Sequence, residues 1–109
     1  MAQMAGDDAA QAFWEAAEPA LNRDGVQTGT MMGFPCLRWQ GVFFASSDRA
    51  TGDLVVKLPE ARVRALITDG AAITFAPNGR TFRDWARVQR RDPASWRRLI
   101  DEALAFAEA

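Results

Sequence analysis

The stretch MMGFPCLRWQGVFFA, residues Met31 to Ala45, decides the fold class of this sequence. It places two Met, one Cys, one Trp and three Phe around one Pro and two Gly. Residues 36–39 and 42–46 have the composition of two short strands, and the two residues between them, Gln40 and Gly41, match the length that hairpin turns favour. The stretch therefore predicts a β-hairpin with apolar side chains on both faces.

Similar patterns extend outward in both directions. Helical periodicity and capping predict helices at Asp7–Leu21, from Pro59 to Gly70, and from the Asp92-Pro93 start to the C-terminus. Strands are predicted at 26–32, 54–58, 72–75 and 82–88 in addition to the hairpin. The order α-β-β-β-β-α-β-β-α predicts an α+β fold with a mainly antiparallel sheet and helices packed on it. We expect a disordered N-terminus over residues 1–6 and a single domain over residues 7–109.

Three local details follow from the same patterns. Pro19 should kink or end the first helix near Glu18. Gly33 and Pro35 should interrupt the strands on either side of them. Strict alternation in the second hairpin strand should place Phe43 and Ala45 on one face and Val42 and Phe44 on the other. On the last helix, the apolar stripe is expected to consist of Trp96, Leu99, Ile100, Ala103 and Ala107.

The composition limits what the chain can be. It has 109 residues, 49% of them hydrophobic, with a single Cys and no His. A single Cys cannot form an intramolecular disulfide, and no apolar run reaches the ~20 residues of a membrane-spanning helix. The N-terminus is acidic and lacks the pattern of a signal peptide. We therefore expect a cytoplasmic protein with no membrane partner.

Basic and acidic residues are segregated along the chain, although the net charge is −1. Residues 80–98 carry seven Arg against two Asp, whereas residues 1–24 and 99–109 are acidic. The segment predicts a basic patch that binds nucleic acid. Its candidate residues are Arg80, Arg83, Trp85, Arg87, Arg90, Arg91, Arg97 and Arg98.

Two arrangements of that patch are open. On a strand, Arg83, Trp85 and Arg87 share one face, so an exposed Trp85 would stack on a base between two phosphate-binding Arg. Alternatively, Trp85 belongs to the core and the two Arg point outward to pair with the acidic terminal helices. The net charge of −1 and the acidic residues that flank the patch favour the second arrangement.

Catalytic chemistry has few candidates in this sequence. Without His or a second Cys, Cys36 has no activating base or metal partner, so it is expected to be a buried, inert strand residue, with Arg38 as its nearest charge. Lys57, the only Lys, precedes a predicted helix start and is a candidate anion-binding residue; otherwise it lies along a half-exposed sheet face. We expect no enzyme, no metal site and no cofactor.

The motifs MMGFPCLRWQGVFFA, GDLVVKLPEARVRALITDG and FAPNGRTFRDWARV, followed by a closing helix, resemble the TfoX/Sxy N-terminal-domain-like and MmcQ/YjbR-like superfamily of small bacterial proteins. The resemblance covers roughly residues 8–108. Positions that match its pattern are Gly33, Pro35, Cys36, Lys57, Leu58, Pro59, Trp85 and Val88. It implies a fold similar to the double-wing DNA-binding fold, and it provides no catalytic residues.

Two functions compete on this basis. The first is a small non-enzymatic module that binds nucleic acid, such as DNA, weakly and without sequence preference, or acts as a regulator. The alternative is a protein–protein interaction module or homodimer with no nucleic-acid role, in which basic and acidic surfaces pair.

Overall fold

The computed structural model describes residues 5–31, 34–48 and 51–109. The described elements are α1 (Ala5–Leu21), β1 (Val26–Met31), β2 (Phe34–Trp39), β3 (Val42–Ser47), β4 (Leu54–Lys57), α2 (Glu60–Thr68), β5 (Ile73–Phe75), the 3-10 turn η1 (Pro77–Gly79), β6 (Phe82–Val88) and α3 (Pro93–Glu108). The predicted α+β class and the predicted order of helices and strands are confirmed.

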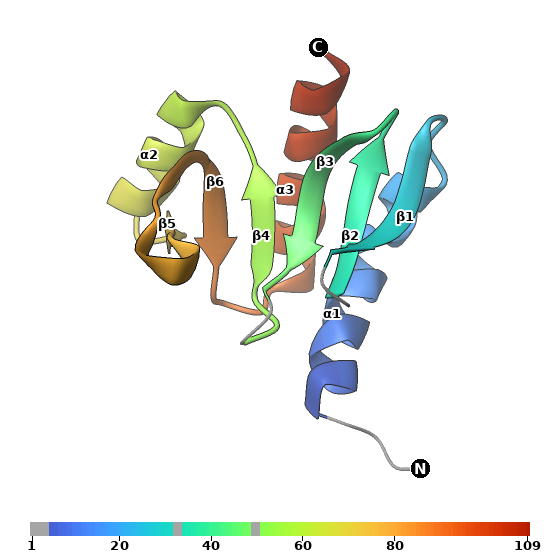
Figure 1. Cartoon of the computed structure of the whole chain (residues 1–109), viewed down its shortest axis with the longest axis horizontal. Coiled ribbons are helices and arrows are strands. Elements are labelled where there is room, and N and C mark those ends of the chain that lie inside the picture. Colours follow the sequence, from blue (N-terminus) through green and yellow to red (C-terminus); the bar gives the residue numbers. More distant parts are fainter. Residues whose placement is uncertain (1–4, 32–33, 49–50) are drawn as a thin grey trace.

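All six strands form one antiparallel sheet in the order β1-β2-β3-β4-β6-β5. The first four strands follow one another along the chain. The chain then leaves through α2 to the outer strand β5, and β6 returns between β5 and β4. In Figure 1, α1 and α3 lie behind the sheet, and α2 lies at the end formed by β5 and β6.

The core fills the space between the helices and one face of the sheet. Phe13 of α1, Leu37 of β2 and Val56 of β4 are fully buried there together with Trp96 and Ile100 of α3. The predicted stripe of α3 is confirmed at Leu99 and Ala103 as well, which are buried. Its last member, Ala107, is only partly buried.

Helix α1 differs from the prediction at both ends. It begins at Ala5, so residues 5 and 6 are helical instead of disordered, and residues 1–4 lie outside the described part of the chain. Pro19 lies inside the helix, which continues to Leu21, so the predicted end near Glu18 is wrong. A Pro this close to the C-terminus removes one backbone hydrogen bond from the last turn, and the turn persists because Ala17 and Ala20 are buried in the core.

Two predictions about the hairpin stretch are corrected. Pro35 lies inside β2 instead of interrupting it, and this is possible because pairing with β3 begins only at Cys36, so the β2–β3 ladder needs no N–H from Pro35. Gly33 lies outside the described residues. In β3 the register shifts, because Leu37 pairs with Ala45 and Arg38 pairs with Phe43. Phe44 is the extra residue of this bulge, and strict alternation therefore fails.

Because of the bulge, the side chains of both Phe44 and Ala45 lie in the interior. Each is fully buried, whereas Val42 at the start of the strand is 40% exposed. The turn before it fits the hairpin prediction, since Gln40 and Gly41 both have positive φ, 47° and 86°. Within the described residues, no helix is both long enough and apolar enough to cross a bilayer.

Candidate nucleic-acid interface

The sheet has a second face, opposite the one that packs on α1 and α3. Lys57 pairs with Trp85 and Val55 pairs with Arg87 between β4 and β6, while the alternating residues Val56 and Ala86 are buried in the core. Side chains of directly paired residues point to the same face. Trp85 and Arg87 therefore share the face away from α1 and α3, as one of the two open arrangements requires.

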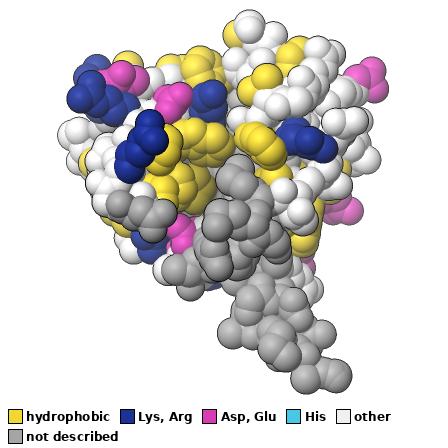
Figure 2. Space-filling view, viewed as in Figure 1, with side chains coloured by type: hydrophobic (Ala, Val, Ile, Leu, Met, Phe, Trp, Pro, Cys, Tyr) yellow, Lys and Arg dark blue, Asp and Glu magenta, His cyan; other side chains and the backbone are white. Residues whose placement is uncertain are grey.

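Figure 2 views the molecule from this side and shows hydrophobic side chains gathered across its middle, with basic side chains on either side. The face is not uniformly accessible, because Cys36 and Val55 on its central strands are buried. Exposed or partly buried side chains lie over β1 and β2, at Gln27 and Arg38, as well as over β5 and β6. We call the half-buried side chains Phe75, Phe82 and Trp85 the aromatic cluster.

The rings of the aromatic cluster contact one another. The centroid of Phe75 lies 5.9 Å from that of Phe82 and 6.3 Å from that of Trp85, with tilted planes. The guanidinium carbon of Arg80 lies 5.3 Å from the centre of the Phe82 ring. Trp85 is partly buried and is not part of the core cluster between the sheet and the helices, so its position matches neither a fully exposed Trp85 nor a core Trp85. Phe75 and Phe82 were not predicted as site residues, although both lie on the predicted strands 72–75 and 82–88, and the second of these also holds Trp85.

The two strand Arg of the predicted patch differ sharply. Arg83 is exposed and forms no ion pair with any described residue. Arg87 is 25% exposed, and its Nε donates to Asp53 Oδ2 at 2.9 Å, with Asp48 Oδ2 at 3.9 Å. The acidic partners of Arg87 come from the segment between β3 and β4, so the predicted pairing with the terminal helices is wrong for this residue. Arg83 is therefore the more available phosphate ligand.

Lys57 is half exposed, and its Nζ lies 3.9 Å from Asp84 Oδ2. Both side chains of this pair are substantially exposed, 34% and 47%. Exposed pairs of this kind are worth at most about 1 kcal/mol, so the pair can open. Lys57 lies on the same face as Trp85, which keeps it as a candidate anion-binding residue at the margin of the aromatic cluster.

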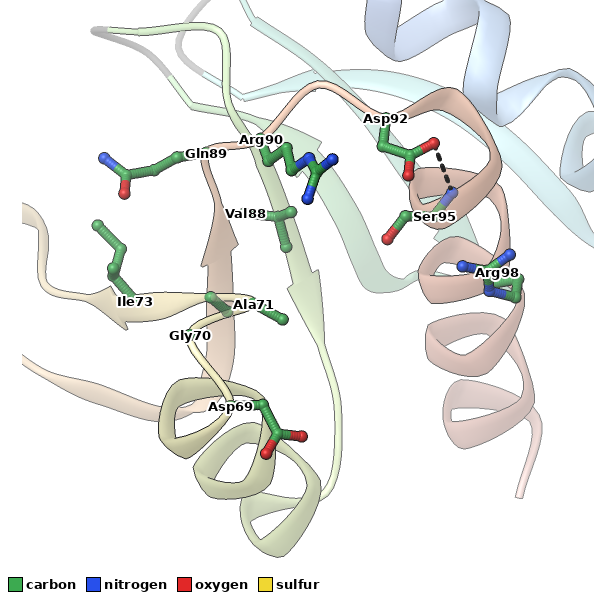
Figure 3. A pocket seen from close by; sticks show the side chains of 11 residues that line it. Asp69, Gly70, Ala71, Ile73, Val88, Gln89, Arg90, Asp92, Ser95 and Arg98 are labelled. Carbon is green, nitrogen blue, oxygen red and sulfur yellow. Dashed lines mark hydrogen bonds between the residues drawn. The ribbon is translucent and has the colours of Figure 1, made fainter.

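The Arg that follow β6 lie in different surroundings. Arg90 and Arg98 line a hollow of about 370 Å³ between the α2–β5 connection and the start of α3, together with Asp69 and Asp92. Figure 3 shows the Arg90 side chain directed toward the α3 side of this hollow, where Asp92 caps the helix by accepting from the backbone N–H of Ser95. The carboxylates in the same hollow reduce its positive potential, so it is a weaker anion site than the Arg count suggests.

Arg91 and Arg97 complete the predicted set. Arg91 Nη2 donates to the Thr51 carbonyl oxygen at 2.8 Å, and its guanidinium lies 5.9 Å from the centre of the Trp96 ring. Arg97 is exposed on α3, the helix behind the sheet. The structure thus divides the predicted continuous patch into a sheet-face part, which contains Arg80 and Arg83, and a part near α3.

Cys36 is fully buried on β2, as predicted. Burial raises the pKa of its thiol, and the nearby Arg38 guanidinium opposes that rise. Arg38 itself lies 5.8 Å from the centre of the Phe43 ring, and its Nε is buried without a hydrogen-bond partner among residues 5–31, 34–48 and 51–109. The described residues contain no group of three or more His, Cys, Asp or Glu that could hold a metal ion.

Comparisons with known protein families, with curated proteins and with solved structures found no match to this chain. The resemblance to the TfoX/Sxy N-terminal-domain-like and MmcQ/YjbR-like superfamily therefore stays a prediction.

Proposed function

We propose that this protein is a small non-enzymatic module that binds nucleic acid weakly and with little sequence preference, and that it acts as a regulatory protein through this binding. The site is the aromatic cluster of Phe75, Phe82 and Trp85, with Arg80, Arg83 and Lys57 as phosphate ligands. The observation that carries the proposal is the position of Arg83 beside half-buried rings on the sheet face away from α1 and α3. Arg83 is exposed and has no ion pair with the described part of the chain.

The geometry favours a single strand over a duplex. Unstacked bases can lie on aromatic side chains of an open antiparallel sheet, whereas a duplex keeps its bases inside. The ring of Trp85 contacts that of Phe75 and is partly exposed, and we propose that one base stacks on its exposed part. Each base stacked on an aromatic side chain contributes about 1–3 kcal/mol, independently of its identity.

The charges predict low affinity. Lys57 forms an ion pair with Asp84, and Arg87 forms one with Asp53. The chain as a whole has a net charge of −1. Few phosphates can therefore be neutralised, and the dissociation constant should lie near the ~10⁻⁴–10⁻⁶ M range of non-specific binding. Such binding suits a protein that associates transiently with nucleic acid, in keeping with a regulatory role.

The test is fluorescence anisotropy with a labelled oligonucleotide, single-stranded or duplex, at low salt. Trp85→Leu should weaken binding to the single strand by about tenfold, the loss of one stacking contact. Trp14→Leu is the matched control, because Trp14 is also half-buried but lies on α1 behind the sheet. Absence of binding at high micromolar protein, or equal losses in both variants, would overturn the proposal. A protein-interaction role would then be the better explanation of the partly exposed aromatic cluster.

A further inference from the structure

The two edges of the sheet differ in how well they resist pairing with another strand. The outer strand β5 has three residues, a register shift between Thr74 and Phe75, and Pro77 shortly after it. The opposite edge, β1, has six residues, VQTGTM, in unbroken register with β2. It contains no charged residue and no Pro. Short length, bulges, charges and Pro are the devices that protect an edge strand, and β1 has none of them.

The backbone groups of β1 that face outward can be identified. Gln40 N donates to Gly25 O at 3.2 Å, so these two residues form a hydrogen-bonded pair just before β1. Hydrogen-bonded and non-hydrogen-bonded pairs alternate along an antiparallel ladder. The residues of β1 that turn their N–H and C=O groups away from β2 are therefore Val26, Thr28 and Thr30. Among these groups, the Val26 N–H is already bonded to Arg23 O at 3.3 Å.

The outward N–H and C=O groups of β1 can pair with the same groups of β1 in a second copy of the chain. With Thr28 on a two-fold axis, Thr28 faces Thr28 of the other copy, and Val26 of each copy faces Thr30 of the other. The arrangement forms about four backbone hydrogen bonds between the strands, and it needs no donor from the occupied Val26 N–H. The side chains of Thr28 and Thr30 are exposed, and cross-strand Thr–Thr pairs are favourable.

We propose that β1 pairs antiparallel with β1 of a second copy of this chain, about a two-fold axis at Thr28. The partner is a second copy because the strand is uncharged and self-complementary, so two copies meet without repulsion. The pairing joins the two sheets into one. It lies at the edge opposite β5 and β6, and it therefore leaves the aromatic clusters of both copies accessible.

The experiment measures the mass of the full chain by sedimentation equilibrium and light scattering up to about 1 mM protein. The wild type should dimerise. Thr28→Pro should raise the dimer dissociation constant by about tenfold or more, because it removes the central N–H and places a ring at the axis. It should leave the fold intact, since the outward Thr28 N–H takes no part in pairing with β2. Far-UV circular dichroism and thermal unfolding check this.

Thr28→Val is the matched control, because it changes the side chain at the same position and keeps both backbone groups; it should remain dimeric. A second variant, Thr28→Lys, places like charges face to face and should weaken the dimer in a way that high salt reverses. A wild type that stays monomeric at the highest concentration would overturn the proposal. A dimer that Thr28→Pro and Thr28→Lys leave unchanged would also overturn it, since the contact would then use another surface.

Discussion

Arg87 and Asp53 form the most buried ion pair among the described residues, with Nε 2.9 Å from Oδ2 and only 25% and 8% of the two side chains exposed. The pair ties β6 to the residue that precedes β4. A cation held this way is a structural element of the sheet and has little freedom to move toward a phosphate. The consequence is measurable in stability.

Asp53→Ala should lower the free energy of unfolding by about 2–4 kcal/mol, because it removes the closer of the two carboxylates beside the largely buried Arg87 guanidinium and leaves Asp48 Oδ2 at 3.9 Å. Urea denaturation gives the value. Asp84→Ala is the matched control, since the Lys57–Asp84 pair is half exposed and 3.9 Å apart, and it should cost less than about 1 kcal/mol. If the two variants lose similar amounts of unfolding free energy, the buried pair contributes no more to stability than the exposed pair.

Trp96 should be a main contributor to the stability of α3. It is 1% exposed, and its Nε1 donates to Arg90 O at 2.7 Å. Trp96→Ala should cost about 3–5 kcal/mol through the cavity it leaves. Trp96→Phe keeps most of the ring and removes the donor, so it should cost about 1–3 kcal/mol. Thermal and urea unfolding of both variants check this, and a loss below about 1 kcal/mol in Trp96→Ala would mean that α3 does not depend on this residue.

The buried thiol of Cys36 predicts a pH dependence of stability. Its pKa in the folded state is raised above the ordinary value of 9.0, so the folded state holds the proton more tightly than the unfolded state. The contribution is fully present below pH 9.0, and it is lost as the pH rises through the folded-state pKa. Unfolding free energy measured from pH 8 upward should therefore fall more steeply in wild type than in Cys36→Ala.

The same burial predicts slow thiol chemistry. Native protein should react with a disulfide reagent far more slowly than denatured protein. The reaction needs an accessible thiolate, and the Cys36 thiol is buried in the native state. Equal rates in the two states, or the same pH slope in Cys36→Ala and wild type, would show that the thiol is accessible.

The sequence was sufficient to predict the class, the order of elements and the α3 stripe, because these depend on local periodicity, turns and caps. Asp92 illustrates this, since it accepts from the N–H of Ala94 at 3.2 Å, as an Asp-Pro helix start predicts. The bulge at Phe44 was not predictable, because it depends on how β3 pairs with β2. Period-two reasoning assumes that every residue has a partner.

The candidate site was predicted only in part, for a similar reason. Runs of Arg are visible in sequence, but their partners lie far away along the chain. The pairing of Arg87 with Asp53 spans 34 residues, and the contact of Arg91 with Thr51 spans 40. Local patterns identify which residues carry charge, whereas long-range contacts determine which of those charges remain free.

The salt dependence of nucleic-acid binding should separate the free Arg from the occupied ones. For a single-stranded oligonucleotide, each lost phosphate contact lowers the slope of log affinity against log salt by about 0.7. Arg83→Gln should lower the slope by that amount, because Arg83 is exposed beside the aromatic cluster. Arg97→Gln is the matched control, since Arg97 is equally an exposed Arg but lies on α3 behind the sheet, and its slope should equal that of wild type. If Arg97→Gln lowers the slope as much as Arg83→Gln, the interface is the longer basic segment of residues 80–98 and not the sheet face.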